Sequence, residues 1–73
     1  MADTSIQSTM AGVILQILVQ KGDTVVVGQD VAVLESMKME VPVQAEQAGE
    51  IASIKVEIGQ FVSEGESLME LLP

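Results

Sequence analysis

The middle of this chain of 73 residues reads Glu35-Ser36-Met37-Lys38-Met39-Glu40, and the segments on either side of it resemble each other. When the sequence is displaced against itself by 37 positions, ten residues of segment 4–36 are identical to their counterparts in segment 41–73. Three of these matches are glycines, which a backbone needs at positive φ or where another backbone approaches closely. The repeat predicts one domain built from two similar halves. The matched pairs are Gln7/Gln44, Ala11/Ala48, Gly12/Gly49, Ile14/Ile51, Ile17/Ile54, Val19/Val56, Gly22/Gly59, Val25/Val62, Gly28/Gly65 and Leu34/Leu71.

Each half is predicted to consist of short β-strands separated by turns at the matched glycines. Leu15, Ile17 and Val19 are expected to share one face of a half-buried strand, because they are apolar at every second position. Residues 52–56 and 39–45 alternate in the same way. These patterns favour an all-β fold.

Three features modify this picture. Pro42 cannot donate a hydrogen bond to a neighbouring strand, so its strand is predicted at a sheet edge or locally unpaired. The apolar runs 25–27 and 31–34 are continuous rather than alternating. Strands that are buried on both faces, or strands that contain a bulge, would produce such runs.

The central segment predicts a hairpin that breaks two local rules. If residues 31–36 pair with residues 39–45, Met37 and Lys38 form its two-residue turn, where glycine and asparagine are preferred because positive φ is required. Glu35 then lies opposite Glu40, and like charges across a ladder destabilise by a fraction of about 1 kcal/mol. Such violations concentrate where function has overridden stability.

Two methionines at an exposed tip favour contact with a partner. There are two ordinary alternatives: Lys38 is a solvated turn lysine, or a register shift by one residue places Met37 and Met39 in the core.

Composition excludes several classes of function. The chain has 11 acidic residues, three lysines, no arginine, no histidine and no cysteine, with a formal net charge of −8. Imidazole bases, thiolate nucleophiles and Cys/His metal sites are therefore absent. Nucleic acid and anionic membranes are unfavourable partners for so acidic a chain, and the acids show no calcium-loop spacing.

The amino terminus shows no signal-peptide pattern, and the apolar run 13–19 is too short to span a bilayer. We therefore expect a cytoplasmic protein. A monomer in isolation is expected for a separate reason, since a closed β-barrel would leave few open strand edges.

The segment from Glu35 to Glu40 resembles the attachment motif of biotin carboxyl carrier proteins and related biotinyl domains. The resemblance extends from about Ile6 to Leu72 and includes the segments 10–12, 21–23, 28–29 and 48–49. It implies a flattened β-barrel, the barrel-sandwich hybrid, in which two four-stranded antiparallel sheets are related by quasi-twofold symmetry. It also implies that the hairpin protrudes and that both termini lie at the opposite end. Segment 10–12 has Ala11 where many members have proline, and Glu46 likewise replaces a proline.

The resemblance further implies that 1–73 is a single, free-standing biotinyl domain and a non-catalytic carrier subunit. A biotin protein ligase would attach biotin to Lys38. The carrier would then move carboxylate between a biotin carboxylase and a carboxyltransferase or decarboxylase. Met37 and Met39 would be recognised by the ligase or the carboxylase, and Glu35 and Glu40 would orient the tip or repel wrong partners.

Three alternatives stay open at this stage. Lipoyl domains share the fold, so Lys38 could carry lipoate instead of biotin or in addition to it, although their lysine is typically flanked by Asp and Ala. An enzyme could use Lys38 as a Schiff-base nucleophile, which requires a desolvated amine. A small acidic docking domain would need no modified lysine at all.

Overall fold

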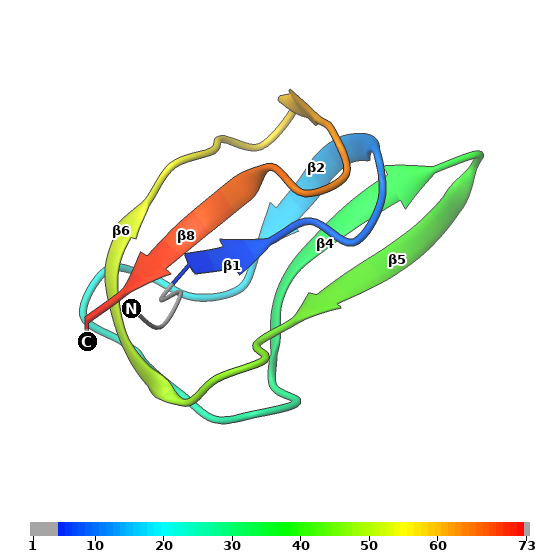
Figure 1. Ribbon diagram of the computed structural model, residues 1–73. Helices are drawn as coiled ribbons and strands as arrows, with labels where there is room; N and C mark the ends of the chain where they lie inside the picture. Colours follow the sequence, from blue (N-terminus) through cyan, green and yellow to red (C-terminus); the bar gives the residue numbers. More distant parts are fainter. Residues whose placement is uncertain (1–4, 73) are drawn as a thin grey trace.

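The computed structural model describes residues 5–72, which form eight β-strands that pair in two antiparallel four-stranded sheets (Figure 1). The strand orders are β1-β8-β6-β3 and β5-β4-β2-β7. Within this described part no helix is long and apolar enough to cross a membrane. The predicted all-β fold of two four-stranded sheets is confirmed. The strands are β1 (Ser5–Gln7), β2 (Gly12–Ile17), β3 (Thr24–Val25), β4 (Asp30–Ser36), β5 (Met39–Gln44), β6 (Gly49–Ile54), β7 (Phe61–Val62) and β8 (Ser67–Leu71).

The repeat in the sequence is also a repeat in the structure. A displacement of 37 residues carries β2 onto β6 and β3 onto β7 with identical bounds. It also brings β1 onto part of β5, and β8 onto part of β4. The strand order of one sheet thereby becomes the strand order of the other. The two sheets are therefore equivalent halves of one quasi-twofold arrangement, as the repeat predicts.

The matched glycines form matched turns. Four of them have φ between 84° and 94°, a backbone conformation that residues with a Cβ rarely adopt. They are Gly22, Gly28, Gly59 and Gly65. Each glycine is the third residue of a four-residue turn, and the fourth residue's side chain accepts a hydrogen bond from the first residue's N–H. Each turn therefore satisfies the N–H of its first residue locally, while the N–H of its glycine donates to a carbonyl oxygen in the other half of the repeat.

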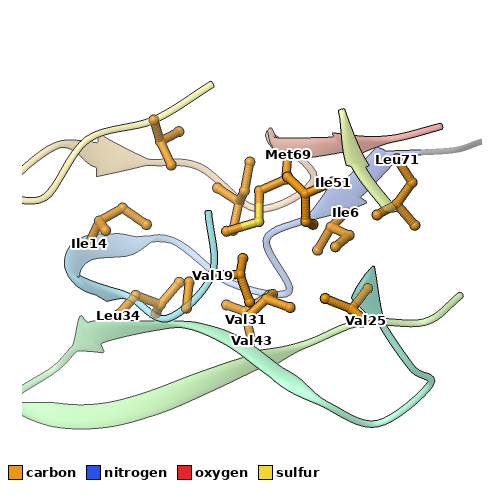
Figure 2. Close-up of a cluster of buried hydrophobic side chains, with 14 of the residues drawn as sticks. Ile6, Ile14, Val19, Val25, Val31, Leu34, Val43, Ile51, Met69 and Leu71 are labelled. Carbon is orange, nitrogen blue, oxygen red and sulfur yellow. The ribbon is translucent and has the colours of Figure 1, made fainter. Parts of the chain in front are cut away.

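The core lies between the two sheets (Figure 2). It consists of aliphatic side chains and one methionine, Met69, which is completely buried. Full burial of a large apolar side chain stabilises the folded state by about 1.5–3 kcal/mol. The buried apolar residues are Ile6, Ile14, Val19, Val25, Val31, Ala32, Leu34, Val43, Ala45, Ile51, Val56, Val62, Leu68, Met69 and Leu71.

Of Leu15, Ile17 and Val19, which are predicted to share one face, Val19 is buried and Ile17 packs against the core as predicted, whereas Leu15 departs from the pattern. The register between β2 and β4 shifts between Ile14 and Gln16, so Leu15 is the extra residue of a bulge. Ile14 is consequently buried completely, while Leu15 is only partly buried. Segment 52–56 is affected in the same way, because Ala52 is the matching bulge between β6 and β8.

The two continuous apolar runs have different explanations. The run 31–34 contains a bulge, since the register between β4 and β5 shifts between Asp30 and Ala32 and leaves Val31 unpaired. The prediction for run 25–27 is wrong, because β3 ends at Val25 and the following two valines are exposed in a turn. Pro42 lies on β5, which is an edge strand as predicted.

Candidate functional site

The central segment forms the predicted hairpin. Strands β4 and β5 pair with Glu35 opposite Glu40 and Ser36 opposite Met39, so Met37 and Lys38 are the two turn residues. The tip of this hairpin projects at one end of the molecule, and β1 begins and β8 ends at the other (Figure 1). The resemblance to biotinyl domains implies such a protruding hairpin, opposite the ends of the chain.

Both turn residues have the backbone conformation that a two-residue hairpin turn requires. Met37 has φ of 54° and Lys38 has φ of 66°, and within residues 5–72 they are the non-glycine residues with positive φ. Two consecutive positive φ values are typical of the type I′ hairpin turn. Each costs roughly 1–2 kcal/mol for a residue with a Cβ. The chain therefore places side chains at two positions where glycine or asparagine would be more stable.

The three side chains at the tip point into solvent. Met37 is 93% exposed and Met39 is 66% exposed, so the alternative that places both methionines in the core is wrong. Lys38 is also exposed. Its ammonium forms no hydrogen bond or ion pair with any other part of the chain between Ser5 and Leu72, whereas Lys55 lies 3.7 Å from a carboxylate oxygen of Glu70.

The base of the hairpin is fixed by packing. Leu34 and Val43 are buried, and Val41, opposite Leu34, packs against the same core. Gly12 of β2 lies so close to β4 that an added Cβ would be 2.5 Å from the carbonyl oxygen of Glu35. In the sequence Gly12 is distinguished only as a repeated glycine, and its tight contact with the hairpin becomes visible only with the strand pairing. The exposed turn thus stands on a rigid support.

The electrostatic environment of the tip is acidic. Glu35 and Glu40 lie directly opposite each other on the exposed strands that lead into the turn. Among the described residues, no group of three acidic side chains is arranged to hold a metal ion. The site therefore presents one free amine between two thioether side chains, with two carboxylates behind it.

The comparisons with known proteins agree with this geometry. A family model for biotin/lipoyl domains, described as "Biotin-requiring enzyme", matches residues 3–71. The chain belongs to this biotin/lipoyl family. The matched residues include the whole hairpin, all of segment 4–36 and all but the last two residues of segment 41–73.

Two relatives carry attachment or carrier names, and this chain spans most of the first and about half of the second. The chain is 47% identical over 62 residues to the biotin/lipoyl attachment protein of Bacillus subtilis, covering 85% of each chain. It is 40% identical over 70 residues to the biotin carboxyl carrier protein of Streptococcus mutans, covering 96% of this chain and 54% of that protein. The chain is therefore a biotin/lipoyl attachment domain with homologues among biotin carboxyl carrier proteins.

The fold also occurs within a much larger solved structure. The urea carboxylase of Kluyveromyces lactis superimposes with a TM-score of 0.86 and 26% identity, over 93% of this chain and 6% of the carboxylase. Domains of this kind thus form a small part of a carboxylase chain.

Proposed function

We propose that the chain is a non-catalytic biotin carboxyl carrier and that Lys38 is its site of biotin attachment. The observation that carries the proposal is the position of Lys38, which is exposed and unpaired at the apex of a strained hairpin turn. The whole of 1–73 would act as a single domain. Family membership supports a covalent group of the biotin or lipoate type, and the carrier relatives support biotin.

The residues of the tip fit an attached acyl group. Nothing between Ser5 and Leu72 competes for the Lys38 amine, and its exposure leaves room for an enzyme around it. An amine in water is largely protonated and is a poor nucleophile, so the ligase would supply the base that removes the proton. The Lys38 nitrogen would then form an amide with the acyl carbon of biotinyl-adenylate, and AMP would leave. The change removes one positive charge and takes the formal net charge from −8 to −9.

Bound biotin would supply a ureido ring that accepts a carboxyl group at a biotin carboxylase and gives it up at a carboxyltransferase or decarboxylase. The protein's own contribution is positional. The buried base of the hairpin keeps the attachment point at the end of the molecule, and tethering raises the local concentration of the group at both enzymes. In this proposal the carrier acts with separate partner enzymes in the cytoplasm and is monomeric on its own.

The flanking side chains have two proposed roles. Met37 and Met39 offer flexible apolar surfaces that adapt to a ligase or carboxylase. Glu35 and Glu40 place negative charge behind the amine, which favours partners with basic surfaces and disfavours acidic ones.

Attachment of lipoate to Lys38 is the second candidate. It is favoured by the name of the Bacillus subtilis relative, which includes both groups. The methionines on each side of Lys38 favour biotin, because lipoyl domains typically have Asp and Ala there. A Schiff-base enzyme is less well supported, since an exposed amine lacks the desolvation that such a nucleophile needs.

Incubation with purified ligases tests the assignment. With biotin protein ligase, biotin and ATP, the chain should gain one biotin by intact mass. Lys38→Arg should gain none, and Lys21→Arg and Lys55→Arg should be labelled like wild type. Parallel incubation with a lipoate ligase separates the two candidates. Labelling of the Lys38→Arg variant would refute the site assignment.

A further inference from the structure

The outer face of the hairpin sheet carries a continuous row of four residues. Glu40 of β5 pairs with Glu35 of β4, Glu35 pairs with Val13 of β2, and Val13 pairs with Phe61 of β7. Directly paired residues point to the same face of a sheet. The row therefore crosses all four strands just below the turn that carries Lys38, with two acids at one end and two apolar side chains at the other.

Phe61 is the unexplained member of this row. It is the single aromatic residue of the chain, and it is 62% exposed on an edge strand. An exposed aromatic side chain gains little from folding, but it is among the side chains that contribute most when a partner buries them.

The quasi-twofold repeat provides an internal comparison. The residues equivalent to Val13 and Phe61 in the other half are Glu50 and Thr24, which pair in the same way between β6 and β3. That polar pair occupies the same position in the same fold. The fold therefore does not require an apolar pair here, and the apolar pair is present only at the hairpin end.

The surroundings of this apolar pair are acidic. Glu35 and Glu40 continue the row toward the turn, and Glu57 and Glu64 lie in the two turns that precede and follow β7. All four side chains are exposed. A partner face that complements this surface is apolar at its centre and basic at its rim.

The geometry points to the enzyme that acylates Lys38 as the occupant, and we propose that it docks on the row Glu40, Glu35, Val13 and Phe61. This inference rests on the proposed function. Neighbouring strands lie about 4.8 Å apart and residues rise about 3.3 Å along a strand, which puts Phe61 roughly 15 Å from the turn. An enzyme whose active site holds the Lys38 nitrogen must come within roughly 15 Å of Phe61. Enzymes that act on the far end of an attached biotin stay farther away by the length of its side chain.

Steady-state labelling with biotin protein ligase, biotin and ATP tests the proposal. The variant Phe61→Thr installs the residue that the other half carries at this position, so the fold should accept it. Its kcat/KM should fall at least about tenfold, as for a residue that a partner buries at the centre of an interface. Val27→Thr is the matched control, because Val27 is 66% exposed in a turn of the other half.

Salt dependence tests the acidic part of the row. The kcat/KM of wild type should fall as ionic strength rises, because complementary charges steer association. The double variant Glu35→Gln with Glu40→Gln should reduce this dependence. The control pair Glu46→Gln with Glu50→Gln, which is also exposed but lies outside the row, should leave it unchanged.

The outcomes separate the two proposals. If wild type is labelled and Phe61→Thr is labelled with the same kcat/KM, the docking surface is refuted while the carrier function stands. If wild type gains no biotin, the proposed function fails and the docking inference fails with it. Unchanged far-UV circular dichroism and unfolding midpoint for Phe61→Thr would exclude misfolding as the cause of a loss.

Discussion

Replacement of Gly12 by alanine should destabilise the fold through one steric contact. A Cβ on Gly12 would lie 2.5 Å from the carbonyl oxygen of Glu35 and 2.9 Å from a methyl carbon of Leu34. Both contacts are shorter than van der Waals packing permits, and the oxygen belongs to the backbone of β4. The strands β2 and β4 must therefore move apart at the base of the hairpin.

The repeat supplies the matched control. Gly49 is the equivalent of Gly12, and a Cβ there would meet its nearest atoms, in Leu71 and Leu72, at 3.5–3.7 Å, which is ordinary contact. Overpacking of the kind expected at Gly12 typically costs 1–3 kcal/mol. Glycine within a strand is less stable than alanine by roughly 0.5–1 kcal/mol, so Gly49→Ala should be neutral or slightly stabilising.

The propensity gain is common to both substitutions, so the two free energies of unfolding should differ by the overpacking cost, about 1–3 kcal/mol. In a domain of this size, each 1 kcal/mol corresponds to a change in Tm of roughly 4–8 °C. Urea denaturation followed by circular dichroism measures both variants under one condition. Equal midpoints for Gly12→Ala and Gly49→Ala would refute the argument that β2 and β4 are packed to contact at this point.

Two other substitutions test the hairpin at its tip and at its base. Met37→Asn combined with Lys38→Gly should raise the free energy of unfolding by about 1–2 kcal/mol, because both φ values are positive and an Asn-Gly pair prefers this turn, yet it should abolish labelling. Equal or lower stability in urea denaturation would contradict the assignment of strain to the turn. Leu34→Ala should lower the free energy of unfolding by about 2–5 kcal/mol, because Leu34 is completely buried, whereas Met37→Ala should leave it within about 0.5 kcal/mol of wild type. A similar loss of stability in the two alanine variants would show that the tip is not separate from the core.

The repeat made much of the fold predictable. Matched glycines mark turns with positive φ, and this requirement is local, so Gly22 and Gly59 could be assigned to equivalent turns without any coordinates. The hairpin was predictable for the opposite reason. Met37 and Lys38 are unfavourable in a two-residue turn, and that conflict distinguished the turn from its surroundings.

The bulges were not predictable from periodicity. A period-two pattern assumes one residue for each partner, and the extra residues Leu15 and Val31 shift the phase within their strands. Val26 and Val27 were misassigned for a related reason. Valine favours strands, but the turn formed by Gly28 and Gln29 determines the backbone there.

The row below the turn required the strand pairing. Val13, Glu35 and Phe61 are distant in sequence and meet on one face only through the registers of β2 with its two neighbours. Sequence patterns gave Glu35 a role in the hairpin, but they contained no signal that connects it to Phe61.

The proposed function requires that Lys38 carries a covalently attached prosthetic group. Tandem mass spectrometry of proteolytic peptides from the chain purified from its own host tests this most directly. We expect one biotin, attached through an amide to the Lys38 side chain, with Lys21 and Lys55 unmodified. An unmodified Lys38 in cells that supply biotin to their other carriers, or a group attached to a different lysine, would contradict it.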